Sequence, residues 1–227
     1  MVERLIRSLV LWELRSTFRR IGWAGAPPDL PPDRPVVIYA NHHNCFDGHF
    51  MWLLTHRLLE RPAILWMDEW DRFPFYSPLG AHPFPLDDAP RRAATIRRTV
   101  RTLRQAPRYV LTYFPEGQLS PPEGGVQPFD DGLLRRLDGL LPNPVWWPVA
   151  IHVTWWTEAR PTAVLTGGNP HEAPSGDEQT RLQTLTDRLR ETASGSVDVL
   201  LDGGQSRAEI WNFSFARRFF YRYLSPP

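Results

Sequence analysis

A short polar segment, residues 41–47, directly follows an apolar run and contains a histidine and an aspartate, His42 and Asp47, separated by four residues. A neutral imidazole can take a proton from a hydroxyl group. A carboxylate on its other ring nitrogen fixes the tautomer and stabilises the imidazolium that forms. The apolar run 36–40 predicts a strand, and catalytic sites of α/β proteins gather at the carboxyl ends of strands. The pair is therefore a candidate for general-base catalysis.

Two further segments combine apolar runs with unusual residue types. Residues 114–117, Phe-Pro-Glu-Gly, stand at the end of a second expected strand. A Glu and a Gly in a tight loop can present a carboxylate and open backbone N–H groups to a ligand; an ordinary turn is the alternative interpretation. Residues 147–151 are apolar with a proline near the start, which taken alone predicts a buried strand.

Together and in this order, the three segments resemble the motifs of the glycerolipid acyltransferase family, the 1-acylglycerol-3-phosphate acyltransferase-like enzymes. The resemblance covers roughly residues 36–155 and includes the strand 147–151. The matching residues are Asn41, His42 and Asp47 of an Asn-His-x4-Asp motif, and Phe114, Pro115, Glu116, Gly117 and Ser120 of a Phe-Pro-Glu-Gly-x-Arg-Ser motif. Phe129 and Gly132 also fall where the family has a Phe and a Gly.

The resemblance implies transfer of a fatty acyl group from an acyl thioester, carried by coenzyme A or an acyl carrier protein, to a hydroxyl group of a lipid acceptor. His42 would act as the general base, and Asp47 would orient it and balance its charge. No metal and no further cofactor is expected. The residues expected to contribute to substrate binding are Asn41, Phe114, Pro115, Glu116 and Gly117.

Cys45 offers a rival mechanism, because a thiolate in this segment could form an acyl-enzyme. The family transfers the acyl group directly, so we favour His42 as the base.

The sequence departs from the family at two arginines that the family links with the phosphate of its acceptor. Where the second motif ends in Arg, this chain has Asp87-Asp88, and Leu119 replaces the Arg of the third motif. A phosphate monoester calls for paired charged donors, which Arg offers and Asp opposes. We therefore favour an acceptor without a phosphate monoester, such as a glycolipid or another lipid alcohol. In the alternative, Arg91 or Arg92 supplies the charge and the protein is a lysophosphatidic acid acyltransferase of phospholipid synthesis.

Two other functions are open at this point. An esterase or thioesterase could use the same His42/Asp47 pair with water, although the chain has no Gly-x-Ser-x-Gly elbow, which removes the commonest serine hydrolase route. A catalytically degenerate family member could bind lipid alone. The intact pair argues against that function, whereas Leu119 and Asp88 favour it.

The composition excludes several classes of site. The chain has 227 residues, 42% of them hydrophobic, which fits one domain with a sizeable core. All 26 basic residues are Arg, so Schiff-base chemistry and a P-loop lysine are excluded. The single cysteine excludes an intramolecular disulfide and Cys-rich metal sites.

Residues 91–108 contain seven arginines and no acidic residue. A solvated helix face is the default interpretation, and the phosphates of coenzyme A or lipid headgroups are the alternative partners. Nucleic acid is not an expected partner, because no recognition motif accompanies the charge.

Hydrophobic periodicity predicts strands that alternate with helices, and hence an α/β fold. We expect a single layered domain with a largely parallel central sheet flanked by helices, plus an N-terminal amphipathic helix. Residues 69–90 are expected to be irregular. Strands are expected at residues 36–40, 63–67, 109–114, 145–153, 162–165 and 197–201, and helices at 48–59, 91–103, 129–141 and 182–192.

The N-terminal segment has an apolar half with a tryptophan and an arginine-rich half when drawn as a helix. Such a helix either packs on its own domain or lies in a membrane interface. The expected division is a membrane-surface helix over residues 1–24 and an acyltransferase domain over 25–227. The aromatic tail, 210–224, is expected to dock on the core or to form a second interfacial patch. The expected location is peripheral, at the cytoplasmic face of a membrane.

Overall fold

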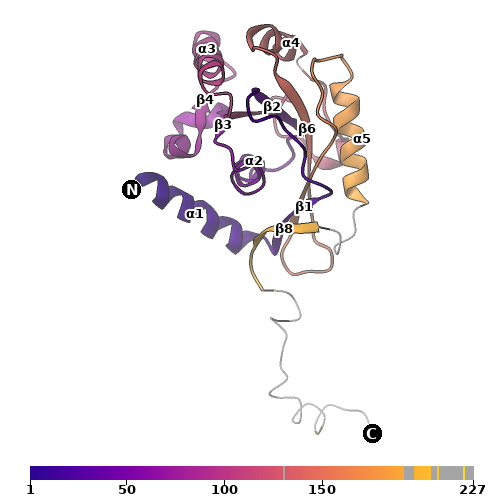
Figure 1. Cartoon of the computed structure of the whole chain (residues 1–227). Coiled ribbons are helices and arrows are strands. Elements are labelled where there is room, and N and C mark those ends of the chain that lie inside the picture. Colours follow the sequence, from indigo (N-terminus) through magenta and orange to yellow (C-terminus); the bar gives the residue numbers. More distant parts are fainter. Residues whose placement is uncertain (130, 192–196, 206–208, 210–221, 223–227) are drawn as a thin grey trace.

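An eight-stranded sheet forms the centre of the computed structural model, which describes residues 1–129, 131–191, 197–205, 209 and 222 (Figure 1). The strand order is β4-β3-β5-β2-β6-β7-β1-β8. The neighbouring strands are parallel except in the pairs β6–β7 and β1–β8. The strands are β1 (Arg20–Ala24), β2 (Val36–Ala40), β3 (Ala63–Met67), β4 (Ala81–Pro83), β5 (Val110–Tyr113), β6 (Val145–Thr154), β7 (Thr162–Gly167) and β8 (Val197–Asp202).

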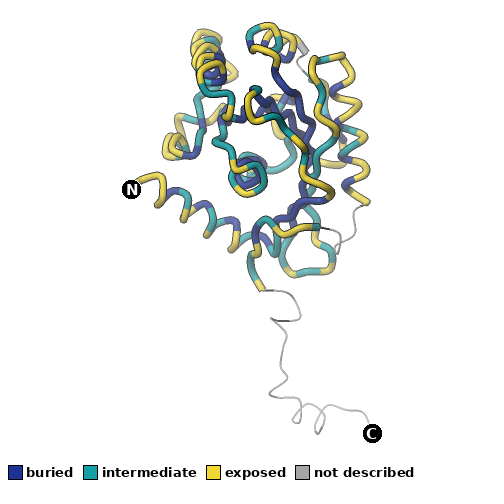
Figure 2. The backbone as a smooth tube through the Cα atoms, viewed as in Figure 1, coloured by how far each residue is buried: buried dark blue, intermediate teal, exposed yellow. Residues whose placement is uncertain are grey.

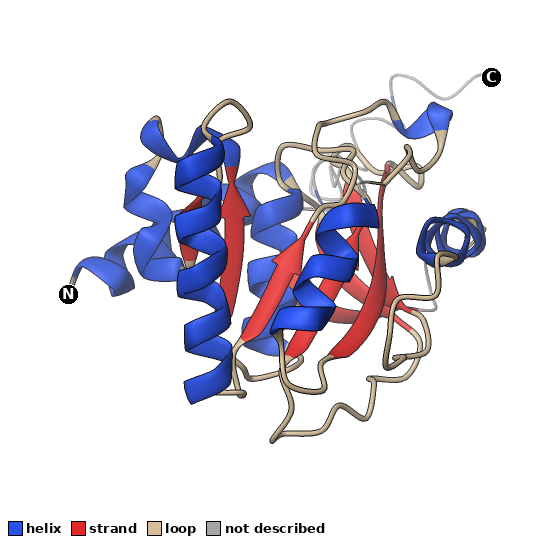
Figure 3. Ribbon diagram, turned by 90° about the horizontal axis from the view of Figure 1, so that it is seen from above, coloured by secondary structure: helices blue, strands red, loops and turns tan. Residues whose placement is uncertain are grey.

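Helices cover both faces of this sheet, which confirms the predicted α/β architecture (Figure 3). The α-helices are α1 (Val2–Thr17), α2 (Asp47–Arg57), α3 (Ala89–Gln105), α4 (Asp131–Leu140) and α5 (Glu178–Arg190). Short 3-10 helices occur at η1 (Asp68–Asp71), η2 (Pro74–Leu79) and η3 (Pro122–Gly124).

The central strand β2 shows why the sequence predicts its position well. All five of its residues are buried (Figure 2). Val36 and Ile38 belong to the core that α1 and α2 cover, whereas Val37 and Tyr39 belong to the core beneath α3, α4 and α5. A strand buried on both faces has an uninterrupted apolar sequence, as residues 36–40 do.

The register of β2 and β5 brings two loops together. The strands are parallel neighbours, and Tyr39 lies opposite Tyr113 near their carboxyl ends. The segments that follow, 41–47 and 114–120, therefore leave the same edge of the sheet side by side. This places the two polar motifs of the sequence next to each other although more than 70 residues separate them.

The predicted helix over residues 1–24 is too long. Helix α1 ends at Thr17, and residues 20–24 form β1, between β7 and β8 in the sheet. The reason is a change of period: Ile21 and Trp23 alternate into the same core with a spacing of two, which suits a strand. Strand β4 is also absent from the sequence prediction; it is a three-residue edge strand that ends in Pro83, inside the segment expected to be irregular.

Helix α1 is part of the domain core on one side and exposed on the other. Ile6, Val10 and Leu14 are buried against the sheet, so a division at residue 24 does not separate two units of structure. No helix among the described residues is long and apolar enough to cross a membrane. The aromatic tail 210–224 lies outside the described residues, apart from residue 222.

The packing of α1 predicts that two leucines of the same helix differ sharply in their effect on stability. Leu14 has no exposed surface, and Leu9 is about half exposed. We expect Leu14→Ala to lower the free energy of unfolding by about 2–5 kcal/mol, because it leaves a cavity in the core. Leu9→Ala should change it by less than about 0.5 kcal/mol. Urea denaturation followed by tryptophan fluorescence measures both, and equal effects would mean that α1 does not pack as described.

Candidate active site

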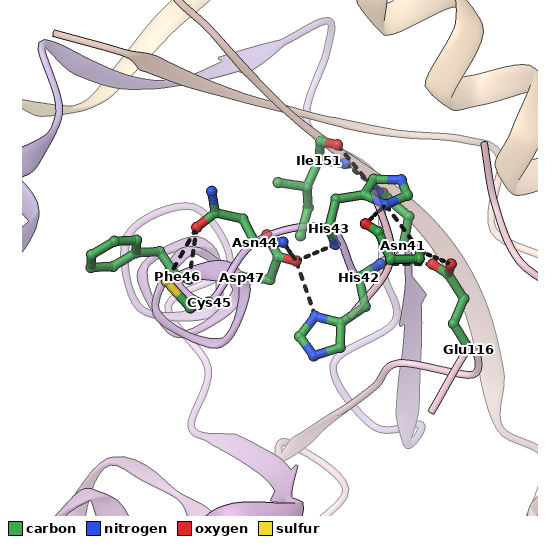
Figure 4. Close-up of polar contacts among 10 residues, drawn as sticks. Asn41, His42, His43, Asn44, Cys45, Phe46, Asp47, Glu116 and Ile151 are labelled. Atoms are coloured by element: carbon green, nitrogen blue, oxygen red, sulfur yellow. Dashed lines mark hydrogen bonds and ion pairs between the residues drawn. The ribbon is translucent and has the colours of Figure 1, made fainter. Parts of the chain in front are cut away.

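His42 and Asp47 form a hydrogen-bonded pair at the carboxyl end of β2. The distance from His42 Nδ1 to Asp47 Oδ2 is 3.0 Å (Figure 4). Because a carboxylate accepts only, Nδ1 carries the proton in the neutral ring and donates it to this bond. Nε2 is then the ring nitrogen whose lone pair can accept a proton from a substrate.

The loop backbone fixes the carboxylate of Asp47 in place. Asp47 is the first residue of α2 and is almost fully buried. Its Oδ2 also accepts hydrogen bonds from the backbone N–H groups of His43 and Asn44, each at 2.8 Å. The turn of the chain and the start of the helix thus hold the carboxylate where it meets the His42 ring.

Two contacts from the Phe-Pro-Glu-Gly segment hold His42 from the other side. The Phe114 ring stacks on the imidazole, with ring centroids 4.4 Å apart and an angle of 18° between the planes. The backbone N–H of His42 donates to Glu116 Oε1 at 2.7 Å. Ser120 N–H in turn donates to the His42 carbonyl at 3.1 Å. The plane of the His42 ring is therefore set by the neighbouring loop as well as by Asp47.

Glu116 fastens three segments of chain to one another. Besides the bond from His42, its Oε2 accepts from Ser120 Oγ at 3.1 Å and from the Gln127 backbone N–H at 2.9 Å. Glu116 also lines a cavity beside His42. Its side chain is buried, and both carboxylate oxygens already accept hydrogen bonds from the protein. Glu116 shapes the site, as the resemblance implies, through bonds within the protein.

Asn41 does not reach the cavity. It is fully buried, and its side-chain amide bonds to the backbone of Ile151 in β6, with Oδ1 accepting from the N–H at 2.7 Å and Nδ2 donating to the carbonyl at 2.9 Å. The expectation that Asn41 binds substrate is therefore wrong: its amide satisfies buried backbone groups and ties β2 to β6.

A cavity of about 800 Å³ opens beside His42. Sites for small ligands have volumes of this order and are lined by apolar and aromatic side chains with few polar groups. Phe114, Pro115, Glu116 and Gly117, the residues that the resemblance implies in substrate binding, all line it. The other aromatic residues of its lining are Trp66, Phe84, Tyr113 and Phe129.

Two arginines line this cavity, and one of them, Arg92, is among the two that the sequence predicts. Arg92 lines it from α3, with its guanidinium donating to the carbonyl oxygens of Pro85 and Leu86. Arg136 lines it from α4, where it is exposed and has no hydrogen bond or ion pair with a described residue. Arg136 is absent from the residues predicted from the sequence, although its spacing of four from Gly132, a position that matches the family, is a signal that points to it.

Arg91 lies outside the cavity lining, so its predicted role in binding substrate is not supported. Its two terminal nitrogens donate to the two carboxylate oxygens of Asp71 at 2.6 and 2.7 Å. The hydrogen bonds from Arg91 lower the pKa of the Asp71 carboxyl. A guanidinium held in this way by a carboxylate is already paired.

The acidic pair and the leucine that the sequence places near an acceptor also lie outside the lining. Asp88 caps α3 by accepting from the Arg91 backbone N–H at 2.9 Å, Asp87 is exposed, and Leu119 is exposed. None of the three lines the cavity. The repulsion expected between these carboxylates and a phosphate in the site is therefore absent.

Cys45 is poorly placed for a nucleophile. It is exposed and does not line the cavity. Burial of the sulfur, more than any charge, raises the pKa of its thiol, which lowers the fraction of reactive thiolate. These observations favour His42 over Cys45 as the reacting group.

Comparisons with known proteins show the family and the fold of the chain. A family model described as Acyltransferase matches residues 26–152, more than half of the chain. The fold resembles the crystal structure of the 1-acyl-sn-glycerophosphate (LPA) acyltransferase PlsC from Thermotoga maritima, with a TM-score of 0.53 and 17% identity over 85% of this chain and 79% of that one. No curated protein matches the sequence. With the His42–Asp47 pair, the cavity beside it and this family match, the chain belongs to the acyltransferase family.

Proposed function

We propose that the protein transfers a fatty acyl group from an acyl thioester to a hydroxyl group of a lipid acceptor. The observation that carries the proposal is the His42 ring, which lines the cavity and has Nδ1 bonded to Asp47 and Nε2 left for substrate. Nε2 takes the proton of the acceptor hydroxyl while the oxygen of that hydroxyl attacks the carbonyl carbon of the thioester. The new C–O bond forms, the C–S bond breaks, and the proton passes to the departing thiolate. Asp47 stabilises the transient imidazolium.

The first prediction concerns this pair. His42→Ala and Asp47→Ala should each lower acyl transfer by about 10²–10⁴-fold, the usual contribution of general-base catalysis. Cys45→Ser should keep most of the activity. Initial rates with palmitoyl-CoA and a panel of hydroxyl acceptors measure all three variants, and circular dichroism checks that they fold.

An inactive Cys45→Ser variant, or an acyl group trapped on Cys45, would contradict direct transfer. The same assay distinguishes the other functions open from the sequence. A thioesterase would release free fatty acid with no acylated product, and a lipid-binding protein would do neither.

Two arginines in the lining of the cavity support an acceptor that carries an anionic group such as a phosphate. The sequence-based preference for an uncharged acceptor depended on Asp87, Asp88 and Leu119, none of which lines the cavity. Arg92 and Arg136 line it, and guanidinium groups bind phosphate through paired charged hydrogen bonds. Asp68 also lines it, and its Oδ1 accepts a hydrogen bond from the Leu86 N–H. We therefore propose a phosphate-bearing lipid alcohol, which is the second of the two acceptors left open by the sequence.

Arg136→Gln tests the acceptor. We expect it to raise KM for lysophosphatidic acid about tenfold or more, since a hydrogen bond to a charged group is worth about 1.5–3 kcal/mol. KM for an uncharged monoacylglycerol should not change. Arg91→Gln is the matched control, because Arg91 pairs with Asp71 outside the cavity. Equal effects of Arg136→Gln on both acceptors, or none on either, would contradict a phosphate site.

We also propose that the protein binds peripherally at the cytoplasmic face of a membrane, and the exposed face of α1 supports the membrane contact. Val2, Leu5, Leu9 and Trp12 are more than half exposed and recur at helical spacing, while Arg4 and Arg15 on the same helix are exposed too. A helix with an apolar face and arginines beside it lies in the interface of an anionic bilayer.

A deletion of residues 1–24 would also remove β1, so we use point substitutions to test this surface. We expect Leu9→Glu and Trp12→Glu to weaken co-sedimentation with phosphatidylglycerol vesicles by about tenfold each, because burial of one such side chain contributes about 1.5–3 kcal/mol. Trp155→Glu is the control, since Trp155 is also more than half exposed but lies outside α1. Binding that is insensitive to both α1 substitutions would exclude α1 as the membrane contact.

A further inference from the structure

Helix α3 presents an exposed row of arginines with no acidic residue among them. Its buried face consists of Ile96, Val100 and Leu103 together with two threonines. Three arginines, Arg97, Arg101 and Arg104, are exposed and follow one another at spacings of four and three residues. Such spacing puts them on one side of the helix, in a row about 10 Å long. We call these three residues the α3 arginine row.

The positive charge of the α3 arginine row is not neutralised within the described part of the chain. Arg97 and Arg101 have no hydrogen bond or ion pair with a described residue, and Arg104 donates only to the carbonyl of Leu140 in α4. Some exposed arginines elsewhere are paired with a carboxylate, as Arg72 is with Glu69. Exposed guanidinium groups without carboxylates are free to meet an acidic partner.

The α3 arginine row begins at the cavity that contains His42. Ala93 and Ile96, in the first half of α3, line the cavity, and Arg97 follows them directly. Arg136 lines the same cavity from α4, and the bond from Arg104 to Leu140 joins the two helices. Positive charge therefore continues from the cavity onto the outer surface of α3.

The shape of this surface does not suit a small ligand. None of Arg97, Arg101 and Arg104 lines the cavity, so the row lies on the outward side of a helix. Small molecules bind in concave sites that surround most of their surface. An exposed helix face of one charge sign instead suits contact with the surface of another macromolecule.

Helix α3 differs in position and in composition from the helix proposed for the membrane. Helices α1 and α3 pack on opposite faces of the sheet, although Glu3 and Arg7 of α1 and Arg98 and Thr102 of α3 line one common pocket at its edge. The α3 arginine row also has no exposed large apolar neighbour on its helix, which a membrane interface would favour.

We propose that the α3 arginine row is the docking surface for an acidic carrier protein that presents the acyl thioester. The inference rests on the proposed acyl transfer and names the form of its donor. Opposite charge steers the two proteins together and fixes their orientation, so that the thioester arm enters the cavity from the side of α3 and α4.

The test compares two acyl donors in a variant that lacks two of the charges. We expect Arg97→Gln/Arg101→Gln to raise KM for palmitoyl acyl carrier protein about fivefold or more, with kcat unchanged. KM for palmitoyl-CoA should stay at the wild-type value. The matched control is Arg57→Gln/Arg188→Gln, which removes two exposed arginines from α2 and α5 and should change neither KM. Raising the ionic strength should weaken use of the carrier protein in the wild type more than in the α3 variant.

Three outcomes would overturn the proposal. Equal effects on both donors would show that the row contacts coenzyme A or the acceptor, and no effect on either would show that it contacts no substrate. Loss of binding to phosphatidylglycerol vesicles in the α3 variant would make the row a membrane contact instead.

A direct binding measurement separates this proposal from the proposed function. Fluorescently labelled palmitoyl acyl carrier protein is titrated with the wild type and with both double variants. Binding that is about fivefold weaker only in the α3 variant supports the docking surface, even if no acyl transfer to any acceptor is found. Absence of binding to the wild type overturns the docking surface, even if transfer from palmitoyl-CoA is active.

Discussion

Oδ2 of Asp47 accepts three hydrogen bonds, from the His42 ring and from the backbone N–H groups of His43 and Asn44. A carboxylate buried to this degree is costly unless its charge is met by such donors. Because the donors come from the loop and the acceptor from the first residue of α2, the bonds fix how the chain turns from β2 into the helix. Together with the stacked Phe114 ring, this oxygen sets the orientation of the His42 ring, and hence the side of the imidazole that faces the cavity.

A second carboxylate, that of Glu116, holds loops together through hydrogen bonds in a similar way. Glu116 accepts hydrogen bonds from His42 in the loop after β2, and from Ser120 and Gln127 in the loop after β5. The parallel pairing of β2 with β5 brings the loops close, and Glu116 then sets their distance. The Phe-Pro-Glu-Gly sequence is thus explained by architecture: the ring of Phe114 supports the imidazole, and the carboxylate of Glu116 holds the backbone behind it.

The sequence predicts what depends on local spacing and on long apolar runs. The buried strand 36–40, the His42/Asp47 pair and the cavity position of residues 114–117 fall in this group. Prediction from the sequence fails where a partner distant in the chain decides which contacts a residue makes. Asn41 is polar and adjacent to the base, but Ile151 of β6 takes both its amide atoms.

The arginines show the same limit. Arg91 and Arg92 are neighbours in sequence, yet Asp71 holds the first outside the cavity and only the second lines it. Arg136 lines the cavity because α4 packs beside α3. A local sequence pattern does not predict how these two helices pack against each other. Strand β1 is missed for a related reason: its pairing partners, β7 and β8, come from the other end of the chain.

The pairing of β1 with β7 and β8 has a consequence for how the protein folds during its synthesis. Arg20 lies opposite Thr162 on one side and Asp202 on the other, so β1 cannot join the sheet until most of the chain has left the ribosome. Contacts between residues so far apart in sequence form late, since the intervening loop must close first. Helix α1 is made before η2 and α2, on which it packs, as well as before β7 and β8. Until those segments follow, both of its apolar faces, the one later buried and the one that stays exposed, are available to a chaperone or a nearby bilayer.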